Sequence, residues 1–119
     1  VTPQGHDGFI FSSETITMNP NDNPDIVITC MGLMLKPNTL FQDLGVKSVD
    51  TINEVPTTGY TATQQILIDT MHSYALRLSD GKYAVIEIIS DTGGQGCFAQ
   101  HLRTTRIKYK YQPNGSNKF

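Results

Sequence analysis

The 119-residue chain contains no tryptophan, only two cysteines and few charged residues, which make up 17% of it. No apolar run approaches the roughly 20 residues that cross a bilayer, so we expect no membrane span. Nine Lys and Arg stand against 11 Asp and Glu, and the resulting formal charge of −2 argues against a nucleic-acid-binding protein. The length fits one folding unit, and we expect residues 1–119 to form a single domain.

Apolar residues alternate with polar ones over much of the chain, which predicts β-strands rather than helices. The clearest strands cover residues 73–79 and 83–90, joined by an Asp-Gly turn, and a third covers 104–112. Residues 63–71 fit either a short helix or a strand. The sequence therefore predicts an all-β, antiparallel β-sandwich of about six to nine strands with little or no helix. Shorter strands are expected at residues 9–11, 15–18, 26–29, 46–49 and 52–55.

A further pattern consists of turns and aromatic residues spread over most of the chain. It includes VPTTGY at 55–60, HSYALRLSDGKYA at 72–84, IEI at 86–88 and YKYQP at 109–113, with GFIFS at 8–12 and NPDI at 23–26 upstream. With these segments the chain resembles the HmuY-like β-domain of secreted bacterial lipoproteins and surface proteins. The resemblance implies an extracytoplasmic β-sandwich, and some members of that family bind haem through paired histidines or methionines.

Haem binding is accordingly the alternative function, with His72 and His101 as candidate axial ligands. His72 matches a histidine that is common at the strand entrance of this domain type, and His101 lies in an expected loop. A structural role for His72 beside Tyr74 is the competing interpretation.

Oxygen-bearing side chains gather in one turn, where Asp22, Asn23 and Asp25 could hold a calcium ion. The spacing lacks the central glycine and distal glutamate of an EF-hand loop, and an ordinary turn between strands also explains it. Otherwise we expect no cofactor. Because the sequence has no nucleophile elbow and no supported Ser, His and Asp set, we expect no enzyme.

Cys30 and Cys97 lack the short spacings of zinc or haem-attachment motifs. They can form one disulfide or remain two buried thiols, and both interpretations stay open. The sequence starts at Val1 without a signal segment, as a secreted chain does after signal-peptide removal, and as an excised domain also does. We expect an extracellular or cell-surface location.

Charge is unevenly distributed along the chain. Residues 1–35 hold four acidic and no basic residues, and residues 100–119 hold five basic and no acidic ones. This polarity favours head-to-tail association of identical subunits, although pairing within one domain or lysine protection of an edge strand would also explain it.

The sequence therefore predicts a self-associating surface or filament subunit joined by strand exchange. We expect residues 1–12, through Phe9 and Phe11, to act as the donor strand. Ile107, Tyr109 and Tyr111 would then form part of the receiving groove.

Overall fold

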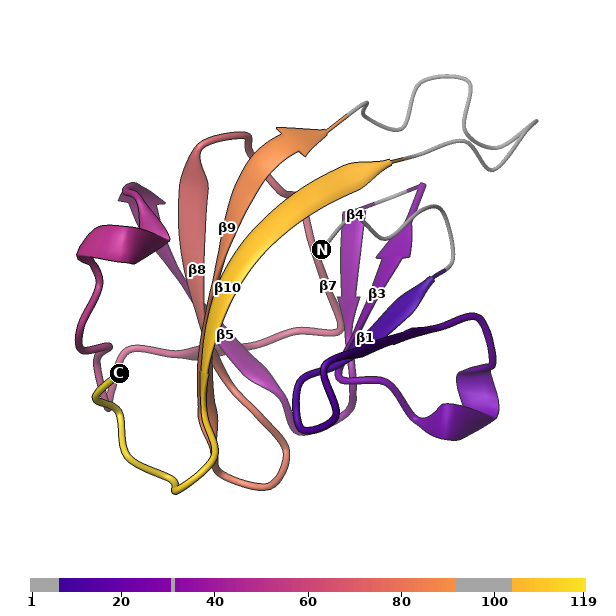
Figure 1. The fold of residues 1–119 in the computed structure, drawn as a ribbon, viewed down its shortest axis with the longest axis horizontal. Helices are drawn as coiled ribbons and strands as arrows, with labels where there is room; N and C mark the ends of the chain where they lie inside the picture. Colours follow the sequence, from indigo (N-terminus) through magenta and orange to yellow (C-terminus); the bar gives the residue numbers. More distant parts are fainter. Residues whose placement is uncertain (1–6, 31, 92–103) are drawn as a thin grey trace.

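The computed structural model describes residues 7–30, 32–91 and 104–119. Within these ranges the protein is an antiparallel β-sandwich of two five-stranded sheets (Figure 1). The predicted all-β class is confirmed, and the ten strands exceed the expected six to nine by one. None of the helical segments in these ranges is long and apolar enough to cross a membrane.

The two sheets differ in strand length. In spatial order, the first contains β2 (Thr15–Thr17), β1 (Gly8–Ile10), β3 (Ile26–Thr29), β4 (Gly32–Leu35) and β7 (Gln65–Ile66). The second contains β10 (Thr105–Gln112), β9 (Tyr83–Asp91), β8 (His72–Arg77), β5 (Leu40–Val46) and β6 (Thr61–Ala62). The helical segments of the described ranges are two 3-10 turns, η1 (Pro20–Asp22) and η2 (Val49–Thr51).

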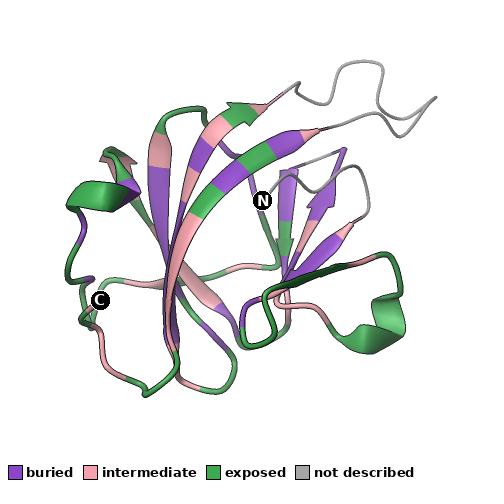
Figure 2. Ribbon diagram, in the orientation of Figure 1, coloured by how far each residue is buried: buried purple, intermediate pink, exposed green. Residues whose placement is uncertain are grey.

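The main hydrophobic core lies between the facing sides of the two sheets (Figure 2). Strand alternation sends one side chain in two inward, as where Phe9 stands opposite Ile26 and both are 1% exposed. The sheets are thus held together mainly by apolar burial. The core also includes Phe11, Ile28, Leu33, Tyr74, Leu76, Ile86, Ile88 and Ile107.

A second apolar cluster covers the outer face of the second sheet, the one that contains β8 and β9. Val49, Ile52 and Val55, from the segment that contains η2, pack on Ala75 of β8 and on Tyr83 and Val85 of β9. β9 is therefore buried on both faces, which explains its nearly continuous apolar sequence.

The segment around η2 differs from the prediction of strands at 46–49 and 52–55. Ser48 caps a 3-10 turn there, because its Oγ accepts a hydrogen bond from the Asp50 backbone N–H at 3.3 Å. Residues 63–71 contain the short strand β7 and no helix.

β4 and β5 were not predicted from the sequence. Gly32 begins β4 at φ +135°, and a Cβ there would lie 2.2 Å from the Ile66 carbonyl oxygen of β7. The close approach of β7 thus requires glycine at this position.

Candidate strand-exchange site

The aromatic residues predicted to meet between subunits meet within one chain. The Phe9 ring centroid lies 5.1 Å from that of Tyr109, and the Phe11 ring lies 5.6 Å from Tyr109 and 6.0 Å from Tyr111. Ile107, which precedes Tyr109 on the same face of β10, belongs to the same core. The five residues therefore form one contact between β1 and the segment after it, on one sheet, and β10 on the other.

β1 occupies an interior place in its own sheet. It pairs with β2 on one side and β3 on the other. The backbone N–H of Asp25 donates to the Phe9 carbonyl at 3.0 Å, and the backbone N–H of Phe11 donates to the Asp25 carboxylate at 2.9 Å. The described part of the predicted donor strand is thus seated in a slot made by the rest of its own chain, whereas residues 1–6 of that prediction lie outside the described residues.

The Asp25 carboxylate, which accepts the hydrogen bond from Phe11, lies in a partly buried position with little access to water. Burial raises the pKa of Asp25, and the hydrogen bond from the Phe11 N–H and the charge of Lys36 only partly oppose that effect. The contact therefore joins β1 to a carboxylate that is costly to keep ionised.

The connection from β1 to β2 is a tight turn at the surface. Ser12, Ser13 and Glu14 are exposed, and the Glu14 N–H donates to the Phe11 carbonyl at 3.2 Å. Glu14 has φ +54°, a left-handed conformation that is strained for a residue other than glycine. The turn therefore stores some strain next to the aromatic contact.

One hydrogen bond ties this turn to the opposite sheet. The Tyr109 hydroxyl donates to the Glu14 carboxylate at 2.7 Å. Burial, together with this bond to an anion, raises the pKa of Tyr109 to about 12. The hydroxyl therefore stays protonated, and the bond persists, throughout the neutral range.

A hollow of about 700 Å³ opens beside the turn and along β10. β10 is an edge strand, since β9 is its sole strand partner among the described residues. On this edge side Tyr109 and Tyr111 are partly exposed, whereas Phe9 and Phe11 beneath them are only 1% exposed. The hollow is lined by Phe11, Ser12, Glu14, Phe119 and residues 109–113.

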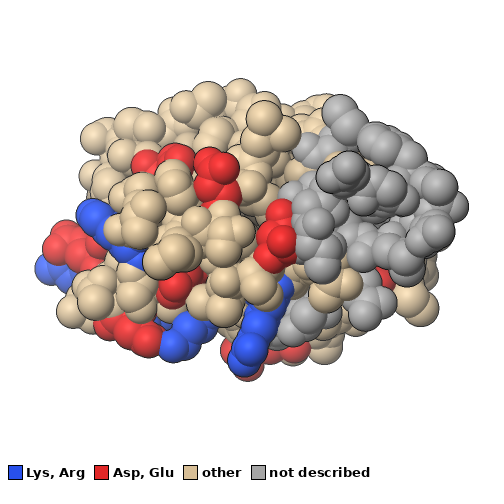
Figure 3. Space-filling view, turned by 90° about the horizontal axis from the view of Figure 1, so that it is seen from above, with Lys and Arg blue, Asp and Glu red and all other residues tan. Residues whose placement is uncertain are grey.

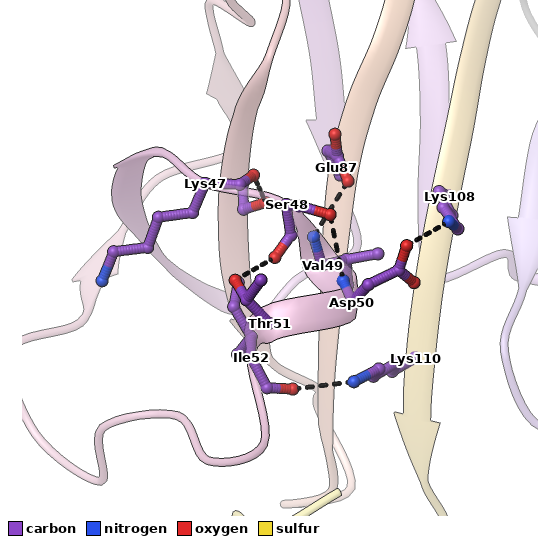
Figure 4. Close-up of polar contacts among 10 residues, drawn as sticks. Lys47, Ser48, Val49, Asp50, Thr51, Ile52, Glu87, Lys108 and Lys110 are labelled. Carbon is purple, nitrogen blue, oxygen red and sulfur yellow. Dashed lines mark hydrogen bonds and ion pairs between the residues drawn. The ribbon is translucent and has the colours of Figure 1, made fainter.

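The lysines of β10 turn away from this edge and across the outer face of the sheet (Figure 4). Lys108 Nζ lies 2.5 Å from an Asp50 carboxylate oxygen, and Lys110 Nζ donates to the Ile52 carbonyl at 3.0 Å. These contacts place two cations of the predicted basic strand, Lys108 and Lys110, against the segment containing η2. They pair with the middle of the chain and not with its acidic first third.

One face of the molecule shows little separation of acidic from basic groups. On the described part of the face in Figure 3, most side chains are uncharged, and acidic and basic groups stand close together. One acidic residue of the first third, Glu14, contacts β10 directly through Tyr109. Charge polarity along the sequence is thus not a polarity of the folded surface seen there.

The predicted calcium turn is held by its own hydrogen bonds. Asn19 Oδ1 caps η1 by accepting from the Asn21 N–H at 3.0 Å, and the Thr17 hydroxyl donates to the Asp22 carboxylate. Asn23 follows in a left-handed conformation at φ +57°. Because the carboxylate of Asp25 accepts from Phe11, the two acidic groups of this turn serve different partners.

Of the two predicted haem ligands, His72 lies at the start of β8 and His101 lies outside the described residues. His72 Nδ1 is 3.0 Å and 3.2 Å from the two Asp43 carboxylate oxygens, and its ring stacks on Tyr74 with centroids 6.2 Å apart. The predicted structural position beside Tyr74 is therefore present, together with a carboxylate partner that the sequence did not indicate.

Cys30, which follows β3, is 7% exposed and disulfide-bonded. Cys97, the one other cysteine of the sequence, lies outside the described residues. The sequence left open either a disulfide or two buried thiols, and Cys30 forms a disulfide.

No protein-family model, curated protein or solved structure matches this chain.

Proposed function

We propose that the protein is an extracellular assembly subunit that joins identical copies by exchanging β1. The observation that carries this proposal is the packing of Phe9 and Phe11 against Tyr109 and Tyr111 across the open edge of the sandwich. In the assembled form, Phe9 and Phe11 of one copy would occupy the same slot in the next copy.

Exchange of this kind has a low energetic cost, because the interactions that β1 gives up within its own chain form again with the next chain. The hinge would be the turn at residues 11–14, where opening relieves the positive φ of Glu14. Because β1 precedes the other described strands, one hinge is sufficient to release it. Each copy then donates at one place and accepts at another, which propagates head to tail.

The extracellular location rests on separate observations. Cys30 is disulfide-bonded, and disulfides persist mainly in oxidising compartments. The resemblance to HmuY-like surface domains and the low charged content of 17% favour the same location.

A removable cross-link tests the exchange. Ile10 of β1 stands directly opposite Thr15 of β2, so the double substitution Ile10→Cys with Thr15→Cys can bridge the two strands and close the hinge. The wild-type chain should form oligomers or filaments in light scattering and electron microscopy as its concentration rises. The oxidised double variant should remain monomeric and should assemble once reduced.

A matched pair controls for the added cysteines. Leu40→Cys with Ala62→Cys bridges β5 to β6 in the other sheet and leaves the hinge free, so it should assemble like the wild type. The wild type with reductant controls for reduction of the Cys30 disulfide. Assembly of the oxidised hinge variant would contradict exchange of β1, and a wild type that stays monomeric would contradict assembly altogether.

Haem binding is the second candidate, and the contact between His72 and Asp43 favours it. A carboxylate on one imidazole nitrogen commonly orients the other toward a metal, which would leave His72 Nε2 for an axial bond. Titration of the full chain with haem should then give a Soret band that His72→Ala or His101→Ala abolishes. An unchanged haem spectrum would reject this candidate without affecting the assembly proposal.

A further inference from the structure

Three potential metal ligands meet where β5 and β8 diverge. Atoms of Asp43, Asp69 and His72 that could bind a metal all lie within 4.8 Å of one another. Asp43 lies on β5, His72 begins β8, and Asp69 lies in the turn before β8. This group is separate from the aromatic contact and from the turn containing Asp22.

Local backbone structure places these three side chains together. The β5–β8 register shifts between Asp43 and Val46, and the Gly45 N–H of that irregularity donates to Asp43 Oδ1 at 2.8 Å. The chain then reverses before β8, where Met71 has φ +71° and the His72 N–H donates to the Asp69 carbonyl at 3.2 Å. The bulge and the turn therefore aim Asp43 and Asp69 at the same imidazole.

Tyr74 holds two members of the group in position. Its ring stacks on His72, and its hydroxyl accepts a hydrogen bond from the Asp69 N–H at 2.9 Å. Tyr74 thus holds the His72 ring and the Asp69 backbone in place.

Among the described residues, no Lys or Arg forms an ion pair with the two carboxylates of this group. Within the described ranges, the Asp69 carboxylate has no hydrogen bond or ion pair with another side chain, and the hydrogen bonds of the Asp43 carboxylate go to the Gly45 N–H and to His72. Two carboxylates within 4.8 Å repel each other, and a divalent cation between them would remove that repulsion.

The spacing also suits coordination. Ligand atoms on one ion with bonds of about 2.0–2.1 Å lie roughly 3 Å apart. The 3.0 Å and 3.2 Å between His72 Nδ1 and the Asp43 oxygens already match that spacing, and the exposed Asp69 side chain can close the remaining gap by rotation. Metal bound at Nδ1 would replace the hydrogen bond to Asp43.

We propose that Asp43, Asp69 and His72 form a binding site for a divalent transition-metal ion such as Zn²⁺. One imidazole and two carboxylates are a ligand set that zinc accepts, with water completing the coordination. Calcium and magnesium prefer oxygen ligands alone and should bind more weakly.

Calorimetric titration of the full chain with zinc chloride tests this site. We expect one zinc ion per chain at this group, with affinity reduced at least about tenfold by His72→Gln and by Asp69→Asn. In ¹H–¹⁵N spectra, zinc should shift the His72 ring nitrogens and the amides of residues 43–46 and 69–72. Calcium should bind at least about tenfold more weakly than zinc.

Two control variants separate this site from other zinc-binding groups. Asp80→Asn removes an exposed acid beyond the far end of β8, and the double substitution His6→Gln with His101→Gln removes the other histidines of the sequence. Both should retain the zinc affinity of the wild type. Zinc affinity unchanged by His72→Gln and Asp69→Asn, absence of zinc binding, or equal affinity for calcium would overturn the proposal.

Discussion

Asp25 links residue chemistry to the position of a whole strand. Its carboxylate accepts the Phe11 N–H and its own N–H donates to the Phe9 carbonyl, so both of these groups hold the segment proposed to exchange. Burial raises its pKa above the ordinary value of 3.8. The folded state therefore binds a proton at Asp25 more tightly than the unfolded state does.

The raised pKa of Asp25 sets a direction for the effect of pH on stability. Because the folded chain holds the extra proton, the contribution of this group to stability is greatest below pH 3.8 and is lost as pH rises through the raised pKa. Asp25→Asn keeps an oxygen for the Phe11 N–H and removes the charge. Urea unfolding at several pH values should show the variant gaining stability relative to the wild type between pH 3.8 and neutrality.

Asp22→Asn is the control for removal of one negative charge from the same turn. It should not reproduce the relative gain. If Asp25→Asn and the wild type have parallel stability profiles over this pH range, the desolvation of Asp25 is not significant for folding.

At the scale of elements, two carboxylates in different surroundings connect η2 to the second sheet, which contains β9 and β10. Glu87 of β9 accepts the Val49 N–H at 2.9 Å in a partly buried place, whereas Asp50 pairs with Lys108 where both side chains are more than half exposed (Figure 4). A partly buried charged acceptor contributes more than an exposed ion pair, which water and salt screen.

Substitution of these two acids should therefore have unequal effects. Glu87→Ala leaves the Val49 N–H without its partner and should reduce the free energy of unfolding by about 1–3 kcal/mol. Asp50→Ala should reduce it by less than about 1 kcal/mol. Urea unfolding followed by circular dichroism measures both, with Glu87→Gln expected to recover part of the stability. Equal effects of the two alanine variants would show that the Glu87 contact is no stronger than the surface pair.

The elements that could be predicted from sequence are those whose pattern is local. Apolar and polar residues alternate clearly in β8, β9 and β10, and turn residues join or end these strands. Their own sequences were therefore enough to predict them. β5 reads LFQDLGV, where a bulge and Gly45 interrupt the alternation, and β4 depends on β7 approaching Gly32. Such features depend on partners distant in the chain.

The same distinction applies to the candidate sites. The sequence predicted that Phe9 and Phe11 of one subunit would meet Ile107, Tyr109 and Tyr111 of the next, and in the structure the aromatic residues of this set meet within one chain. Tyr74 was predicted beside His72, but Asp43 was not predictable there, because it is 29 residues away and reaches His72 only through the shifted register of β5.

At the scale of the whole molecule, the Cys30 disulfide is a constraint on most of the second sheet and on part of the first. With Cys97 as the one other cysteine, the segment between the two contains β4 through β9. Closing a loop of roughly 70 residues stabilises the folded state by about 4 kcal/mol, chiefly by restricting the unfolded chain. The double substitution Cys30→Ser with Cys97→Ser should lower the free energy of urea unfolding by about this amount. Reductant should lower the wild type to the level of the double variant and leave that variant unchanged. A wild-type unfolding midpoint insensitive to reductant would show that apolar packing in the two clusters, and not the bridge, maintains the sandwich.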